Sequence, residues 1–188
     1  MLQNILHILI LFKFSNSSPP NIILFLADDL GFNDISWHNP HVQSTNLQDL
    51  ASSGIILDHH YAQPVCTPTR GSLLTGRYPI NIGLNNGVIA SLSPYGLDVK
   101  FMLLPQELQR WEEDFLPNLI NHIYIRAGYK SHIIGKWHLG YCNKKFWPQN
   151  RGFDSFYGFL TGAEGYYYHN NDNHWDERKY SLYIHRSA

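Results

Sequence analysis

Three short segments of this chain carry residues that could do chemistry together. Asp28-Asp29 follows an apolar run, Cys66 opens the run C-T-P-T-R, and Lys136 and His138 lie in the run G-K-W-H-L-G. Paired carboxylates suit a hard cation such as calcium. A nucleophile, an ammonium that can hold a negatively charged oxygen and an imidazole that can transfer a proton are the further components of an ester-cleaving site.

The residue at 66 lies at the start of a predicted helix. Thr67 can act as the N-cap, and Pro68 suits the first helical position because the N–H that proline lacks would be unpaired there. The free N–H groups and the dipole at this end of a helix favour negative charge. Residues 54–62 are predicted to form a strand that leads into the turn, and a strand, a turn and a helix in this order are typical of a presented nucleophile.

The run C-x-P-x-R, followed by L-T-G-R at residues 74–77, resembles the signature of the sulfatase family. The resemblance implies that Cys66 is converted to formylglycine by a formylglycine-generating enzyme. In that family one hydroxyl of the hydrated aldehyde attacks sulfur and the alcohol departs, and the other hydroxyl then expels sulfate and regenerates the aldehyde. The resemblance also implies that Arg70 holds the hydrate and balances its charge. Taken alone, C-x-P-x-R would indicate an ordinary buried cysteine before a helix.

Residues 21–27, N-I-I-L-F-L-A, form a continuous apolar run that predicts a central strand covered on both faces. Asp28 and Asp29 follow it, and open parallel sheets bind ligands outside the carboxyl ends of their strands. An exposed acidic turn would be the simpler interpretation of this pair alone. The pair also resembles the end of the N-terminal sulfatase strand, which implies a calcium ion held by Asp28, Asp29 and the residue at 66.

Residues 128–140 resemble the second sulfatase signature along their whole length. Residues 130–134 are predicted to form a short strand, which would place Lys136 and His138 on one side of an extended segment past its end. The resemblance implies that Lys136 binds sulfate and that His138 acts in the active site near the hydrated aldehyde. Residues 151–159 resemble a structural family segment, and residues 165–169 resemble a loop of arylsulfatase B-like members.

The alternation of short strands and helices, with a helix at about 45–53, predicts a mainly parallel α/β sheet. The resemblance, which covers residues 20 to about 169, implies an alkaline-phosphatase-like sulfatase fold. Residues 19–188 would then be the N-terminal portion of the catalytic domain, and the later half, with the remaining calcium and sulfate ligands, is expected to be absent. Residues 111–126 interrupt the family pattern and are either a helix or an insertion.

Composition limits the classes of function and the compartment. A chain of 188 residues can bury one core, and a formal net charge of −1 gives no electrostatic case for nucleic acid. With two cysteines, one of them reserved for modification, no internal disulfide is expected, and Cys142 is free or has a partner outside the chain. Residues 1–18 are predicted to be a signal peptide whose apolar run is too short to span a bilayer. This predicts entry to the secretory pathway, a lysosomal or extracellular location and no stable membrane span.

Together these features predict a sulfuric ester hydrolase that uses calcium and a formylglycine derived from Cys66. Its substrates would be aryl sulfates or sulfated carbohydrates, among them glycans of amino sugars. One alternative is a phosphatase or phosphodiesterase of the same superfamily, but those enzymes place Ser or Thr at the nucleophile and usually bind two zinc ions. The other alternative is a truncated, inactive protein that binds sulfated ligands.

Overall fold

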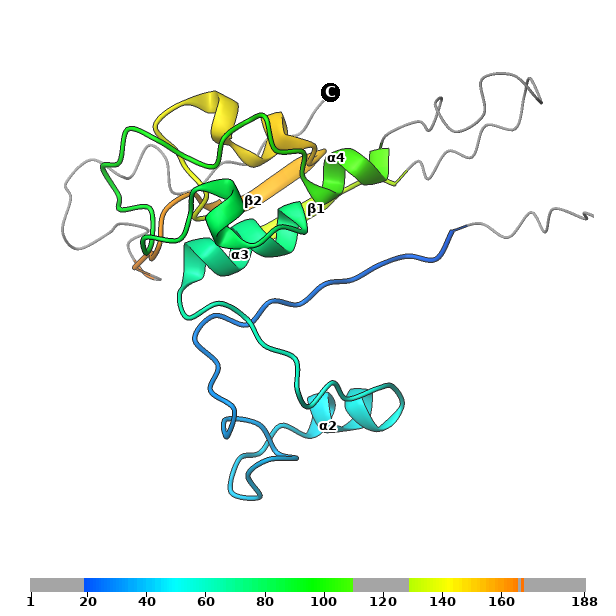
Figure 1. Ribbon diagram of the computed structural model, residues 1–188. Coiled ribbons are helices and arrows are strands. Elements are labelled where there is room, and N and C mark those ends of the chain that lie inside the picture. The colour runs from blue at the N-terminus through cyan, green and yellow to red at the C-terminus, as the bar shows by residue number, and fades with distance from the viewer. Residues whose placement is uncertain (1–18, 110–128, 166, 168–188) are drawn as a thin grey trace, which may run out of the picture.

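The computed structural model describes residues 19–109, 129–165 and 167. Its regular elements are the α-helices α2 (Thr45–Ser52), α3 (Cys66–Thr75) and α4 (Leu104–Gln109), the strands β1 (His132–Lys136) and β2 (Ser155–Phe159), and the 3-10 helices η1 (Pro79–Ile82), η2 (Lys144–Phe146) and η3 (Pro148–Arg151). Figure 1 shows α3, α4 and the two strands in a larger lobe, while the chain before residue 65, with α2, extends away from it.

The strands β1 and β2 form a two-stranded parallel sheet in the described part of the chain. The register pairs His132 with Ser155 and Lys136 with Phe159. Gly158 stands opposite Gly135, and a Cβ atom at 158 would collide with the backbone of Gly135. The predicted parallel α/β arrangement is therefore confirmed.

The core lies between the sheet and the helices of the larger lobe, and its fully buried members include Leu97, Leu103, Trp137, Leu139, Phe156 and Leu160. Helix α3 approaches this core closely at Gly71, where a Cβ atom would come within 2.6 Å of a methyl group of Leu84. Arg151 is also buried, and its guanidinium donates hydrogen bonds of 2.8 Å to the carbonyl oxygens of Leu97 and Phe101. These contacts give the segment 151–159 the structural role that its sequence predicts.

The prediction of a central strand at residues 21–27 is wrong. The segment is extended, but Ile23 is 79% and Phe25 84% exposed, and it pairs with neither strand of the described sheet. It runs beneath the larger lobe in Figure 1 without joining the sheet. An apolar segment becomes a central strand only when neighbouring strands take up its backbone hydrogen bonds and helices cover its faces. The described residues provide neither.

Three other predictions about secondary structure also differ from the structure. Residues 54–62 form turns rather than a strand, with a hydrogen bond from the amide of His60 to the carbonyl of Leu57. The strand predicted at 130–134 lies two residues later, so that Lys136 ends it. Helix α3 has Val65 as its N-cap instead of Thr67. The helix predicted at 45–53 is confirmed as α2, whereas residues 1–18 and 111–126 lie outside the described residues.

Candidate active site

Helix α3 positions two of the predicted site residues. Cys66 is its first residue, and Arg70 lies one turn further along. The Arg70 guanidinium donates a hydrogen bond of 2.5 Å to the carbonyl oxygen of Lys136, and its other terminal nitrogen lies 3.6 Å from a carboxylate oxygen of Asp28. Arg70 therefore joins the nucleophile helix to the end of β1 and to the segment that carries the paired carboxylates.

Lys136 connects the other two segments. Its side chain is only 7% exposed, and Nζ donates to Oδ2 of Asp28 at 2.8 Å and to Sγ of Cys66 at 3.1 Å. Burial by itself would raise the pKa of Asp28, but the hydrogen bond and the charge of Lys136, together with the charge of Arg70, lower it. The ammonium thus lies between an ionised carboxylate and the predicted nucleophile.

Asp28, Asp29 and Cys66 are the group of described residues whose side chains could hold a metal ion. One ligand atom from each lies within 4.8 Å of the others. Asp29 has a left-handed backbone, with φ of 57°, which ends the extended segment at this point. Two carboxylates suit a hard cation, and an oxygen at position 66 would suit it better than sulfur does. Calcium takes six to eight oxygen ligands, so this group could supply only part of a calcium site.

His138 is predicted to lie beside Lys136, but its ring has a different partner. The side chain is 5% exposed, and Nε2 lies 2.9 Å from the carbonyl oxygen of Ile89. A carbonyl only accepts, so Nε2 carries the proton, and Nδ1 has no partner among the described residues. Burial is the main reason why the pKa of His138 is lowered to about 4, and the nearby Lys136 and Arg70 charges act in the same direction. The ring is neutral, and its proton is held by Ile89.

Thr67 is a site residue whose role the sequence does not indicate. Its side chain is fully buried, and Oγ1 donates to the carbonyl oxygen of His138 at 3.0 Å and accepts from the amide of Ile89 at 3.1 Å. Thr67 lies inside helix α3, and its hydroxyl bonds to distant backbone groups instead of capping the helix. One residue after Cys66, it joins helix α3 to the backbone at His138 and at Ile89. Nothing in the spacing of the sequence predicts a contact across 71 residues.

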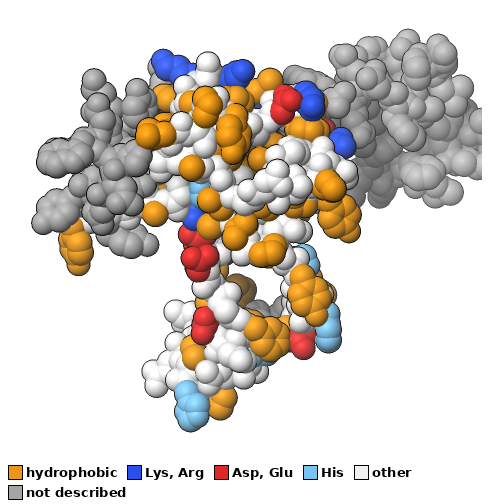
Figure 2. All heavy atoms as spheres, turned by 60° about the vertical axis from the view of Figure 1, so that its left-hand side comes forward, with side chains coloured by type: hydrophobic (Ala, Val, Ile, Leu, Met, Phe, Trp, Pro, Cys, Tyr) orange, Lys and Arg blue, Asp and Glu red, His pale blue; other side chains and the backbone are white. Residues whose placement is uncertain are grey.

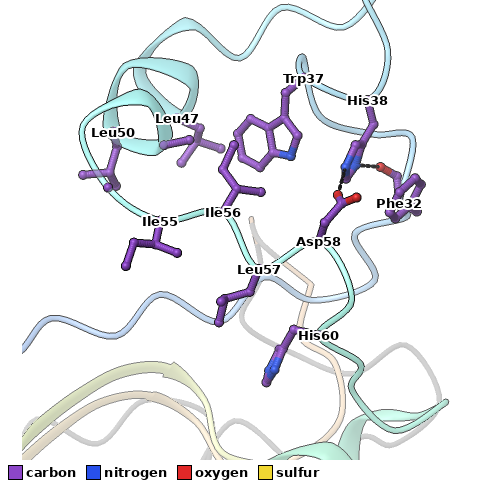
Figure 3. Close-up of a pocket in the computed structure, with 12 residues that line it drawn as sticks. Phe32, Trp37, His38, Leu47, Leu50, Ile55, Ile56, Leu57, Asp58 and His60 are labelled. Carbon is purple, nitrogen blue, oxygen red and sulfur yellow. Dashed lines mark hydrogen bonds and ion pairs between the residues drawn. The ribbon is translucent and has the colours of Figure 1, made fainter.

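A separate hollow lies in the α2 lobe and contains none of these residues. It measures about 490 Å³, and Figure 3 shows apolar side chains from α2 and the segment after it around His38 and Asp58. The two nitrogens of the His38 ring lie 2.7 Å from the carbonyl oxygen of Phe32 and 2.7 Å from the carboxylate of Asp58. Because both partners are acceptors, both contacts are hydrogen bonds only when the ring is doubly protonated.

The sequence of the chain is similar to a known protein family and to several of its members. The family described as Sulfatase matches residues 20–183. Arylsulfatase J of Mus musculus is 37% identical over 155 residues, arylsulfatase H of Canis lupus familiaris is 40% identical over 157 residues, and N-acetylgalactosamine-6-sulfatase of Homo sapiens is 37% identical over 145 residues. These alignments cover 82%, 79% and 74% of this chain.

The structure of the chain is also similar to solved structures. The crystal structure of Ps i-CgsB has a TM-score of 0.59 and 31% sequence identity, and the match covers 78% of this chain and 29% of that one. The structure of Ps i-CgsB in complex with k-i-k-neocarrahexaose has a TM-score of 0.54 and 27% identity, and its match covers 74% of this chain and 28% of that one. The chain spans 23%, 26% and 25% of the lengths of the three sequence relatives, which is about a quarter.

Proposed function

The chain belongs to the sulfatase family, and on this premise we propose that the residues around Cys66 form the nucleophile side of a site for sulfate ester hydrolysis. The observation that carries the proposal is the position of Lys136, whose ammonium contacts both Cys66 and Asp28. Three segments that are distant in the sequence thus meet at one cationic group.

Formylglycine, when hydrated, would supply one hydroxyl that displaces the alcohol of the ester at sulfur, and a second that expels sulfate as the aldehyde is restored. Helix α3 holds the residue at 66 at its N-terminus, where backbone N–H groups favour negative charge. The Lys136 ammonium and the Arg70 guanidinium are the positive charges that can receive the oxygens of a sulfate group. Both are oriented by Asp28, which is held ionised by the same two residues.

Calcium would supply positive charge that balances the anionic oxygens of the substrate and the nucleophile. Asp28, Asp29 and the modified residue at 66 are the groups that would hold it. His138 keeps a neutral ring beside this group, and its Nδ1 has no hydrogen-bond partner among the described residues. In the arrangement described, Nε2 donates to Ile89, so His138 does not offer its proton to a leaving oxygen.

The substrates and partners of the proposal follow from the family. We propose a sulfated carbohydrate or an aryl sulfate as the substrate, and a formylglycine-generating enzyme as the partner that modifies Cys66. Passage through the secretory pathway to a lysosomal or extracellular location, with residues 1–18 as a signal peptide and 19–188 as the N-terminal portion of a catalytic domain, belongs to the same proposal. No helix among the described residues has the length and apolar character needed to cross a membrane.

The modification is tested by producing the chain together with a formylglycine-generating enzyme. The peptide that contains residue 66 should then react with an aldehyde probe and lose its free thiol. Cys66→Ser should abolish the labelling, whereas Cys142→Ser, at the exposed second cysteine, should leave it intact. A free thiol as the only species at position 66 would contradict the proposal.

A protein that binds sulfated ligands without turnover is the second candidate, and one observation favours it. The described metal group offers only two carboxylates besides residue 66, and groups that act together in catalysis lose nearly all activity when several are missing. We therefore expect the labelled chain to carry the aldehyde but to release no measurable sulfate from an aryl sulfate. Calcium-dependent release that is lost in Cys66→Ala would show that the chain is an active enzyme by itself.

A further inference from the structure

Exposed cations gather on the larger lobe at residues that the proposed site does not use. The charged group of each of these side chains lies over an aromatic ring. We call the set the basic surface, and its members are Arg77, Lys100, Lys144 and Lys145. Figure 2 shows Lys and Arg side chains at the end of the larger lobe that faces away from the α2 lobe, with apolar side chains between them. Cys66, Arg70 and Lys136 are not members of this surface.

The cations are connected through shared neighbours. Arg77 and Lys100 lie over the same ring, that of Phe101, at 5.8 Å and 4.9 Å from its centroid. Lys100 also forms an ion pair of 3.2 Å with Asp98. The pKa of Asp98 is lowered first by the hydrogen bond from the Lys100 amide and then by the Lys100 side chain, and the charge of Lys145 lowers it as well. Lys100 by contact and Lys145 by its charge thus act on the same carboxylate.

A buried cation lies beneath this surface and adds to its charge. The Arg151 guanidinium donates to two backbone carbonyls, and no carboxylate forms an ion pair with it among the described residues. Burial lowers the pKa of Arg151, and the charge of Asp98 opposes this change. Lys100, Lys145 and Arg151 thus act on one carboxylate, Asp98, and Arg77 and Lys144 add two further positive charges, in a chain whose formal net charge is −1. Such a local excess produces a positive potential that attracts anionic ligands.

We propose that the basic surface binds a sulfated glycan chain and holds it apart from the site at Cys66. The choice of a glycan among polyanions rests on the proposed function. The rings of Phe146 and Trp147 lie under Lys145 and Lys144 and are themselves buried, so they offer no free faces on which nucleic acid bases could stack. A ligand of this surface is therefore recognised by repeated negative charge, as a polysulfated sugar chain is.

The test measures the affinity of the full chain for heparin, a sulfated glycan, at several salt concentrations. Each exposed cation should contribute a factor of about 1.5 to 5, so Lys144→Gln/Lys145→Gln should weaken binding roughly fivefold. Binding should also weaken as salt rises, because these charges are exposed and screened. Lys130→Gln is the matched control for Lys145→Gln, since Lys130 is also an exposed lysine but pairs with Asp154 outside the basic surface. It should leave the affinity unchanged.

Three outcomes would overturn the proposal: equal weakening by Lys130→Gln and Lys145→Gln, unchanged binding of heparin from which the sulfates have been removed, or tighter binding of a single-stranded oligothymidine. Cys66→Ala separates this proposal from the proposed function. It removes the nucleophile and should leave heparin binding intact. A chain that binds heparin through the basic surface but never carries the aldehyde would contradict only the proposed function.

Discussion

Replacing Thr67 by valine would remove one hydroxyl group from the centre of the candidate site. Valine has nearly the same shape, so the change leaves no large cavity, but a methyl group replaces the oxygen. Two hydrogen bonds are lost, the one donated to the carbonyl of His138 at 3.0 Å and the one accepted from the amide of Ile89 at 3.1 Å. Because Thr67 is fully buried, water does not replace the lost partner.

The expected loss of stability follows from these two contacts. A buried donor or acceptor that loses its partner costs about 1–3 kcal/mol, so the Thr67→Val variant should lose about 2–4 kcal/mol in free energy of unfolding. Thr67→Ser keeps the hydroxyl and removes one methyl group, which should cost about 1 kcal/mol. Thr75→Val is the control in the same helix, since its half-buried hydroxyl bonds to local backbone, donating to the carbonyl of Gly71 and accepting from the amide of Arg77 at 3.3 Å, and it should cost less than about 1 kcal/mol.

Urea denaturation of the parent and the three variants measures these differences, and amide hydrogen exchange locates them. The amide of Ile89 should exchange faster in Thr67→Val and at the parent rate in Thr67→Ser. The free energy of unfolding of Thr67→Val could instead come within about 0.5 kcal/mol of the parent, or match that of Thr75→Val. In that case the hydroxyl would not hold helix α3 to the backbone at His138 and Ile89. The assignment of Thr67 to the site would then be wrong.

Two histidines should respond to pH in opposite directions. The pKa of His38 is raised, first by its hydrogen bond to Asp58, so its contact with the carboxylate should be complete below the ordinary value of 6.5 and be lost as the pH rises through the raised pKa. NMR titration of the ring should show this, His38→Gln should remove the pH dependence, and a midpoint below 6.5 would contradict it. The pKa of His138 is lowered to about 4, so the unfolded chain takes up a proton before the folded one does, and stability should fall between pH 6.5 and 4 by up to about 3 kcal/mol. A ring of His138 that titrates near 6.5 would refute the buried, neutral state.

The elements that sequence analysis predicts correctly are those specified by nearby residues. Helices α2 and α3 have their helical pattern and end signals within about ten residues, and Gly76 ends α3 in a left-handed conformation. The segment 21–27 has the composition of a central strand, but a strand is completed by distant neighbours, which composition does not specify. This is why the helices are correct and the strand at 21–27 is not.

In the candidate site, too, some features could be predicted from the sequence and others could not. The motifs contain Asp28, Cys66 and Lys136, and the structure places these side chains in contact. The partner of His138 is a backbone carbonyl at Ile89, and a backbone group in a loop leaves no mark on the residue type. The left-handed conformation of His138, with φ of 58°, is equally absent from the sequence pattern. Motifs therefore identify the reactive side chains but not the backbone that orients them.

The contact between Gly135 and Gly158 restricts how the chain can be assembled. A slip of one residue in either direction would bring Tyr157 or Phe159 opposite Gly135, where not even a single Cβ atom fits at position 158 in the present pairing. Misaligned pairings of the two strands are thus excluded by steric repulsion. Because Lys136 follows Gly135 directly, the alignment of the two glycines also fixes the position of Lys136 along β2. Changes of length among the exposed residues 142–145 should consequently alter this connection while the position of Lys136 stays the same.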